Sequence, residues 1–167
     1  MRARIALATA ALVVALSAGS VCAAEWGLVN PGTTTQDAVR ERYGAPTKVT
    51  SGKLEGYDEV KWLYEGDQAP RGFVRMTIEF GLLTPQGFKP NLARVMVLEP
   101  RPGIFTRDTI LAGWGAPERY GKEKDADVFF YDAGLLVYFN KEGRFALTLV
   151  FTPRQDPAAA APAPRRP

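Results

Sequence analysis

The chain has 167 residues, 46% apolar and 23% charged, a composition that is ordinary for a globular protein of one domain or of two small units sharing a core. Its net charge of +3 arises at the two ends, which hold five of the 21 basic residues; from residue 25 to residue 153, 16 basic residues stand against 17 acidic ones. A nucleic-acid groove needs clustered positive charge, so the charge distribution excludes nucleic acid as the main partner.

The first 24 residues predict a secretory signal peptide. Arg2 and Arg4 precede an apolar run over residues 5–16, and small side chains follow up to Ala24, which favours cleavage after Ala23 or Ala24. Two alternatives stay open: an uncleaved anchor, because about 20 uncharged residues can span a bilayer, and a lipoprotein anchored at Cys22. After cleavage the mature chain would hold no cysteine, and we expect a periplasmic or secreted protein without disulfides.

The sequence predicts two short helices that share the same start and stop signals. Residues 34–49 read TTQDAVRERYGAPTKV, and residues 106–120 read TRDTILAGWGAPERY. In each copy a threonine, Thr35 or Thr106, predicts the N-cap, and an aspartate follows in the first turn, where the helix dipole favours a carboxylate. Glycine and then proline predict the stop. Because the glycine follows the helix, the Gly-Ala-Pro triplet is a helix end and not a phosphate-binding loop.

Three strand-like segments follow each helix. They cover residues 60–65, 73–80 and 92–98 after the first helix, and 128–131, 135–139 and 145–151 after the second. The predicted fold class is α+β, with two tandem helix-plus-three-stranded antiparallel sheet repeats forming one continuous sheet with helices on one face. The predicted repeats are residues 25–100 and 101–153. A three-stranded unit of about 53 residues would be marginal alone, so we expect the two to share a core.

Alternation along these strands predicts which side chains face the helices. The expected core face carries Met76, Ile78, Phe80, Leu135, Val137, Phe139, Phe145, Leu147, Leu149 and Phe151. The opposite face is polar in the first repeat, at Thr77 and Glu79. In the second repeat it is apolar and carries Leu136, Tyr138, Ala146, Thr148 and Val150. Either the C-terminal segment covers this face or a partner binds there. Residues 154–167 are rich in proline and alanine and predict a disordered tail.

The sequence offers no catalytic or metal-binding constellation. It has no histidine, and the mature chain would have no cysteine, which excludes Cys–His and Ser–His–Asp sites and the usual zinc sites. Carboxylate pairs such as Asp125 with Asp127, or Asp58 with Glu59, could in principle act as general acid and base. Both pairs are more typical of solvated loops. We therefore expect a non-enzymatic protein with no catalytic residue, no metal ligand and no cofactor.

The order of the motifs resembles a known family. Pro31-Gly32, the Thr-x-Asp helix start, Gly-Ala-Pro, a Trp-x-Tyr strand (Trp62, Tyr64) and YFNKEGRF (residues 138–145) together resemble the SmpA/OmlA, or BamE-like, envelope domain. The tandem arrangement is similar to the fold of the β-lactamase inhibitor protein, in which two such units make one curved sheet. The resemblance covers about residues 30–153 and implies a non-enzymatic binding module of the cell envelope.

We expect an exported protein-binding or scaffold module whose partners are envelope proteins, with peripheral association with the outer membrane and the oligomeric state left open. The alternatives are a proteinaceous inhibitor of a secreted or periplasmic enzyme and a carrier of a small apolar ligand. The candidate partner-binding residues lie on the apolar face of the second repeat and in a long loop of the first. They are Leu136, Tyr138, Thr148, Val150, Leu82, Leu83 and Phe88.

Overall fold

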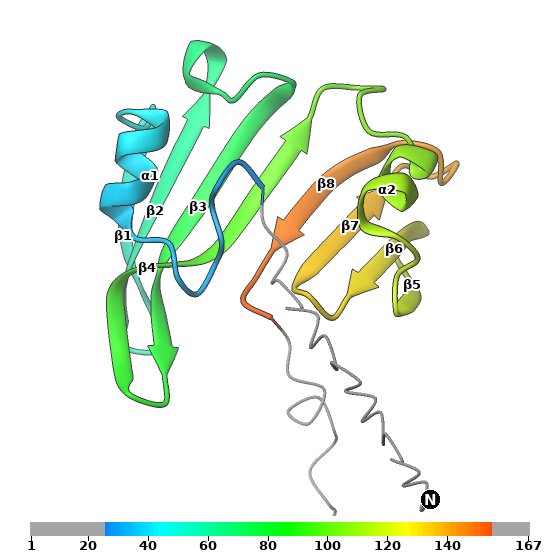
Figure 1. The fold of residues 1–167 in the computed structure, drawn as a ribbon. Helices are drawn as coiled ribbons and strands as arrows, with labels where there is room; N and C mark the ends of the chain where they lie inside the picture. Colours follow the sequence, from blue (N-terminus) through cyan, green and yellow to red (C-terminus); the bar gives the residue numbers. More distant parts are fainter. Residues whose placement is uncertain (1–25, 155–167) are drawn as a thin grey trace, which may run out of the picture.

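Eight strands form one antiparallel sheet in the computed structural model, which describes residues 26–154 (Figure 1). Across the sheet the strand order is β1-β2-β3-β4-β8-β7-β6-β5. In chain order the elements are α1 (Gln36–Tyr43), β1 (Lys48–Leu54), β2 (Tyr57–Glu65), the 3-10 turn η1 (Gly66–Gln68), β3 (Phe73–Thr84), β4 (Gly87–Pro100), α2 (Arg107–Trp114), β5 (Arg119–Glu123), β6 (Ala126–Tyr131), β7 (Leu135–Phe139) and β8 (Ala146–Phe151). The predicted signal peptide, and the predicted tail from residue 155 onward, lie outside the described residues. Within residues 26–154 no helix has the length and hydropathy to span a membrane.

The fold-class prediction is wrong in the strand number and in the class. Four strands, not three, follow each helix, and the helices have only eight residues each, so the fold is mostly β rather than α+β. The missed strands, β1 and β5, are the two edges of the sheet. Every residue of β1 is exposed, as are four of the five in β5, so neither strand shows apolar alternation. Their lysines and glycines suit unpaired sheet edges, where charge opposes aggregation.

Both helices begin and end at the predicted residues. The hydroxyl of Thr35 accepts a hydrogen bond from a first-turn amide at 3.3 Å, and the hydroxyl of Thr106 accepts an equivalent bond at 3.1 Å. Gly44 and Gly115 follow the last helical residues with φ angles of 76° and 79°, a backbone conformation that favours glycine. Figure 1 shows the two helices on the same face of the sheet.

The core lies between the helices and this face of the sheet. Val39 and Ile110 are the buried residues of α1 and α2. Beneath them the sheet contributes Trp62, Tyr64, Met76, Ile78, Phe80, Ala93, Met96, Leu98, Phe129, Tyr131, Leu135, Val137, Phe139, Ala146, Leu149 and Phe151. These side chains recur at every second position along each strand, as expected for one buried face, except at one step in β4 and one in β8, where the pairing register shifts.

The prediction that Phe145 and Leu147 face the core is wrong, because a β-bulge interrupts the pairing of β7 with β8. Tyr138 pairs with Thr148, whereas Phe139 pairs with Ala146, which leaves Leu147 as the extra residue. Consequently Leu147 is 53% exposed, and Ala146, which was predicted on the opposite face, is buried in the core. Phe145 precedes the strand and is only partly buried.

The first half of the sheet has a bulge at the corresponding place. Glu79 pairs with Val95 and Phe80 pairs with Ala93, so Arg94 is the extra residue of β4. The two halves therefore bend at equivalent points, and the bulged residue is charged in one half and apolar in the other.

Candidate protein-binding face

One row of side chains crosses the open face of the sheet, which is the face away from the helices. Each member pairs directly with the next across neighbouring strands, so the row touches all eight. We call it the cross-strand row. From β1 to β5 its members are Lys48, Leu63, Thr77, Val97, Val150, Leu136, Phe130 and Arg119. The six central side chains are partly buried, and a cation stands at each end.

In the first half of the sheet, ion pairs border the cross-strand row on one side. Glu79 accepts contacts from Lys61 at 2.7 Å and from the bulged Arg94 at 2.8 Å. Arg94 also contacts Glu59 at 3.0 Å. Two cations thus neutralise two carboxylates, and this border presents no net charge to a partner.

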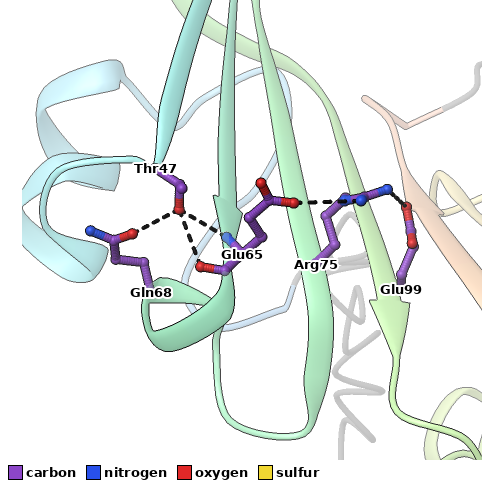
Figure 2. A network of polar contacts seen from close by, with 5 residues as sticks. All are labelled: Thr47, Glu65, Gln68, Arg75 and Glu99. Atoms are coloured by element: carbon purple, nitrogen blue, oxygen red, sulfur yellow. Dashed lines mark hydrogen bonds and ion pairs between the residues drawn. The ribbon is translucent and has the colours of Figure 1, made fainter.

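A second group of ion pairs borders the row on its other side (Figure 2). Arg75 lies between Glu65 and Glu99, with nitrogen–oxygen distances of 3.5 Å and 3.3 Å. Thr47 holds the end of β2 in place, because its hydroxyl accepts a bond from the Glu65 amide at 3.0 Å and contacts Gln68 at 2.8 Å. On β2 and β3 the row is therefore flanked by charged side chains on both sides.

The second half of the sheet replaces one charged border with apolar and aromatic side chains. The pair Lys61 and Glu79 of the first half corresponds to the pair Val128 and Tyr138, which occupy the same register positions on β6 and β7. Leu147 takes the place of the bulged Arg94. The apolar area around the row is consequently wider in this half than in the first.

Side chains of the open face pack against one another in the second half. Val128 is 1% exposed although it does not belong to the core beneath the helices. Burial raises the pKa of the neighbouring Tyr138, and the nearby Glu123 carboxylate raises it further. The Tyr138 hydroxyl therefore stays protonated throughout the neutral range, hydrogen-bonded to the Glu123 carboxylate.

The structure brings four of the seven predicted binding residues together. Leu136 pairs with Val150, and Tyr138 pairs with Thr148 on the same two strands. The sequence interpretation missed Phe130, because it lies in the continuous apolar run VFFY, where alternation cannot assign a face. It also missed Val97 and Leu63, whose place in the row depends on the register between distant strands.

The other three predicted residues form a separate cluster at the far end of the β3–β4 hairpin. Leu83 pairs with Phe88, and the Phe88 ring stacks on Tyr57 with centroids 4.8 Å apart. Leu82 and these three residues line a pocket of about 180 Å³. Tyr57 lies six residues before Leu63, the member of the cross-strand row on β2. Six residues span about 20 Å of strand, so this cluster is not part of the row.

The carboxylates considered for acid–base chemistry do not converge on one site. Asp58 pairs with Lys53 at 2.8 Å, and Glu59 pairs with Arg94. Asp127 pairs with Arg107 at 3.1 Å beside a pocket of about 340 Å³. The Arg107 guanidinium also lies 4.6 Å from the centre of the Phe129 ring, a contact that stabilises this end of the core.

Residues 26–154 contain no group of three or more Asp, Glu, His or Cys side chains that could hold a metal ion.

The open face has a shallow pocket near the Lys48 end of the cross-strand row. That pocket has a volume of about 260 Å³ and is lined by Lys48, Thr50, Lys61, Leu63, Arg75, Thr77 and Glu99.

No family model matches the chain, and no curated protein matches it. Among solved structures, the chain is similar to a DUF4309 family protein (YjgB) from Bacillus subtilis subsp. subtilis str. 168. The two share 12% identity over 73% of this chain and 80% of that one, with a TM-score of 0.47. At this identity and score, the likeness assigns neither a family nor a function.

Proposed function

We propose that this protein is an exported, non-enzymatic binding module that holds a partner protein of the cell envelope on the open face of its sheet. The observation that carries the proposal is the cross-strand row, with the apolar side chains that widen it in the second half. Export rests on the signal-like sequence of the first 24 residues.

Comparison of the two halves supports a binding role for the open face. An antiparallel sheet needs only one buried face. In the first half, the open face carries ion pairs among Lys61, Glu79 and Arg94. The architecture therefore tolerates charge at these positions. Tyr138 and Leu147, in the places of Glu79 and Arg94, are not required by the fold, and exposed apolar and aromatic side chains of this kind are typical of a protein-interaction site.

Photo-crosslinking in the native envelope tests the proposal directly. A photoreactive phenylalanine analogue at Phe130 or Tyr138 should crosslink to one partner protein. The same analogue at Val49, an exposed apolar residue that pairs with Trp62 and so lies on the helix side of the sheet, should not. Equal crosslinking from both faces, or none from the row, would show that the open face is not the binding site.

A second test measures partner binding after a charge is introduced into the cross-strand row. Leu136→Glu should abolish binding of the crosslinked partner, because a buried carboxylate without a counter-charge is strongly unfavourable at an interface. Val49→Glu makes the same change on the other face and should leave binding unaltered. If the partner is a hydrolase, its activity in the presence of equimolar protein separates an inhibitor from a scaffold.

A further inference from the structure

We infer that the partner reaches this face through an amphipathic α-helix that lies across the strands, with a narrow apolar stripe and an acidic residue at each end. This inference rests on the proposed function and names the chemistry of the segment that fits. Four features of the described residues lead to it: the end charges, the borders, the symmetry of the row and its length.

The two ends of the cross-strand row are its cationic positions. Lys48 is exposed and forms no ion pair among the described residues. Arg119 is 60% exposed in its side chain and contacts Asp132 at 3.6 Å, while its guanidinium lies 5.7 Å from the centre of the Phe130 ring. An exposed pair of this length contributes little free energy, so a partner carboxylate can replace Asp132 at low cost.

The borders of the row do not attract a charged partner in the same way. Lys61 and Arg94 form ion pairs with Glu59 and Glu79. Arg75 forms ion pairs with both Glu65 and Glu99. The free positive charge therefore stands at the two ends, and the neutral or slightly acidic borders favour polar, uncharged or basic flanks on the partner. Complementary charge of this kind sets the register of an interface more than its affinity.

A second copy whose row lies along the row of the first does not fit the charge pattern. A two-fold axis along the row would place Lys48 against Lys48 of the other copy. An axis perpendicular to the row would place Lys48 against Arg119. Either arrangement brings like charges together at both ends, which is unfavourable at an interface.

The length and backbone chemistry of the row favour a helix. Seven strand spacings of about 4.8 Å separate its ends, about 34 Å in all, which an α-helix covers in about 22 residues. The ladder uses the backbone hydrogen-bonding groups of the sheet, so a segment lying across the strands must satisfy its own backbone. A helix does so internally, whereas an extended segment in this orientation does not.

Two synthetic helical peptides, each of about 22 residues, test the inference on the full-length protein. Both carry the same narrow leucine stripe, widened at one end; one has two glutamates at each end, and the other has two lysines. Isothermal titration should show that the acid-ended peptide binds the wild type about tenfold more tightly, since each exposed ion pair contributes a modest amount. Raising the salt concentration should reduce this difference.

Charge-reversal variants test whether Lys48 and Arg119 cause the preference for the acid-ended peptide. Lys48→Glu combined with Arg119→Glu should invert it in favour of the lysine-ended peptide. Lys53→Glu combined with Lys122→Glu makes the same charge change on the same two edge strands outside the row, and should keep the wild-type preference. Equal binding of both peptides, or a preference that persists in the first variant, would overturn the inference.

The remaining outcomes are also decisive. If Tyr138 crosslinks to a partner while neither peptide binds, the helix inference fails and the proposed function stands. A wild-type dimer in sedimentation analysis that Leu136→Glu dissociates would assign the row to a second copy and overturn the inference. A monomer supports it.

Discussion

Tyr64 and Tyr131 connect each helix end to the sheet through a single hydroxyl. Tyr64 donates to the Gly44 carbonyl at 3.2 Å, and Tyr131 donates to the Gly115 carbonyl at 3.0 Å. Both side chains belong to the buried core, and desolvation raises the pKa of each to about 12. The glycine that ends each helix in the sequence is therefore also the acceptor that holds that helix against its strands.

These tyrosines predict a loss of stability at high pH. Because the folded-state pKa is raised from 10 to about 12, their contribution is complete below pH 10 and is lost as the pH rises through 12. Chemical denaturation from about pH 8 to about pH 12 should show the free energy of unfolding falling in this window. The double variant Tyr64→Phe with Tyr131→Phe should be less stable than wild type at about pH 8, by about 0.5–1.5 kcal/mol for each lost bond, but should decline less steeply. An unchanged slope would contradict this role.

At the scale of elements, bulges and edges shape the sheet. Gly81 lies where the register between β3 and β4 shifts, and there the Phe88 ring packs against the backbone. Gly81 has a φ of 107°, and a Cβ there would lie 3.0 Å from the Asp58 carbonyl oxygen and 3.2 Å from the Phe88 ring. The backbone carbonyl cannot move aside as a flexible side chain could, so this hairpin depends on glycine.

Gly81→Ala should therefore destabilise the protein more than Gly87→Ala, the matched control in the same hairpin. Gly87 has a φ of 102°, but a Cβ added there would meet no atom within 4 Å beyond its chain neighbours, so only the backbone strain of about 1–2 kcal/mol applies. The additional contact at Gly81 should raise the cost further, as measured by urea denaturation. Equal costs for the two variants would show that the hairpin relaxes around the new side chain.

At the scale of the whole molecule, the two halves of the sheet meet at a short seam. Only three residue pairs join β4 to β8, with Val97 opposite Val150 at the centre. An aromatic contact reinforces this seam on the helix side. Phe73 at the start of β3 lies 4.6 Å from the Trp26 ring and 5.7 Å from the Phe105 ring, which precedes α2. Phe73 therefore couples the first half to the segment that leads into the second.

Phe73→Ala should lower the free energy of unfolding by about 3–5 kcal/mol, the usual cost of removing a buried phenylalanine. Because the seam is short, we also expect the variant to lose cooperativity, so that tryptophan fluorescence and circular dichroism report different midpoints. Val74→Ala, at a neighbouring residue that is 48% exposed, is the control and should change stability little. Coincident transitions in Phe73→Ala would show that the three ladder pairs suffice for coupling.

The sequence by itself determined the local features of this protein. The caps at Thr35 and Thr106 and the stops at Gly44 and Gly115 follow from hydrogen bonds and backbone angles within one turn of helix. Alternation also identified most core-facing residues of the interior strands, and Leu136, Tyr138, Thr148 and Val150 as one face. All of these depend on residues that are close together along the chain.

Only the tertiary structure decided the strand number, the bulges and the cross-strand row. The edge strands β1 and β5 bury almost nothing, so their pairing depends on the neighbouring strand and leaves no apolar pattern in the sequence. The bulge at Leu147 moved that side chain from the expected core to the surface. The row joins Leu63 to Phe130 through registers between strands that are far apart in the chain, and such registers are set by packing of the whole sheet.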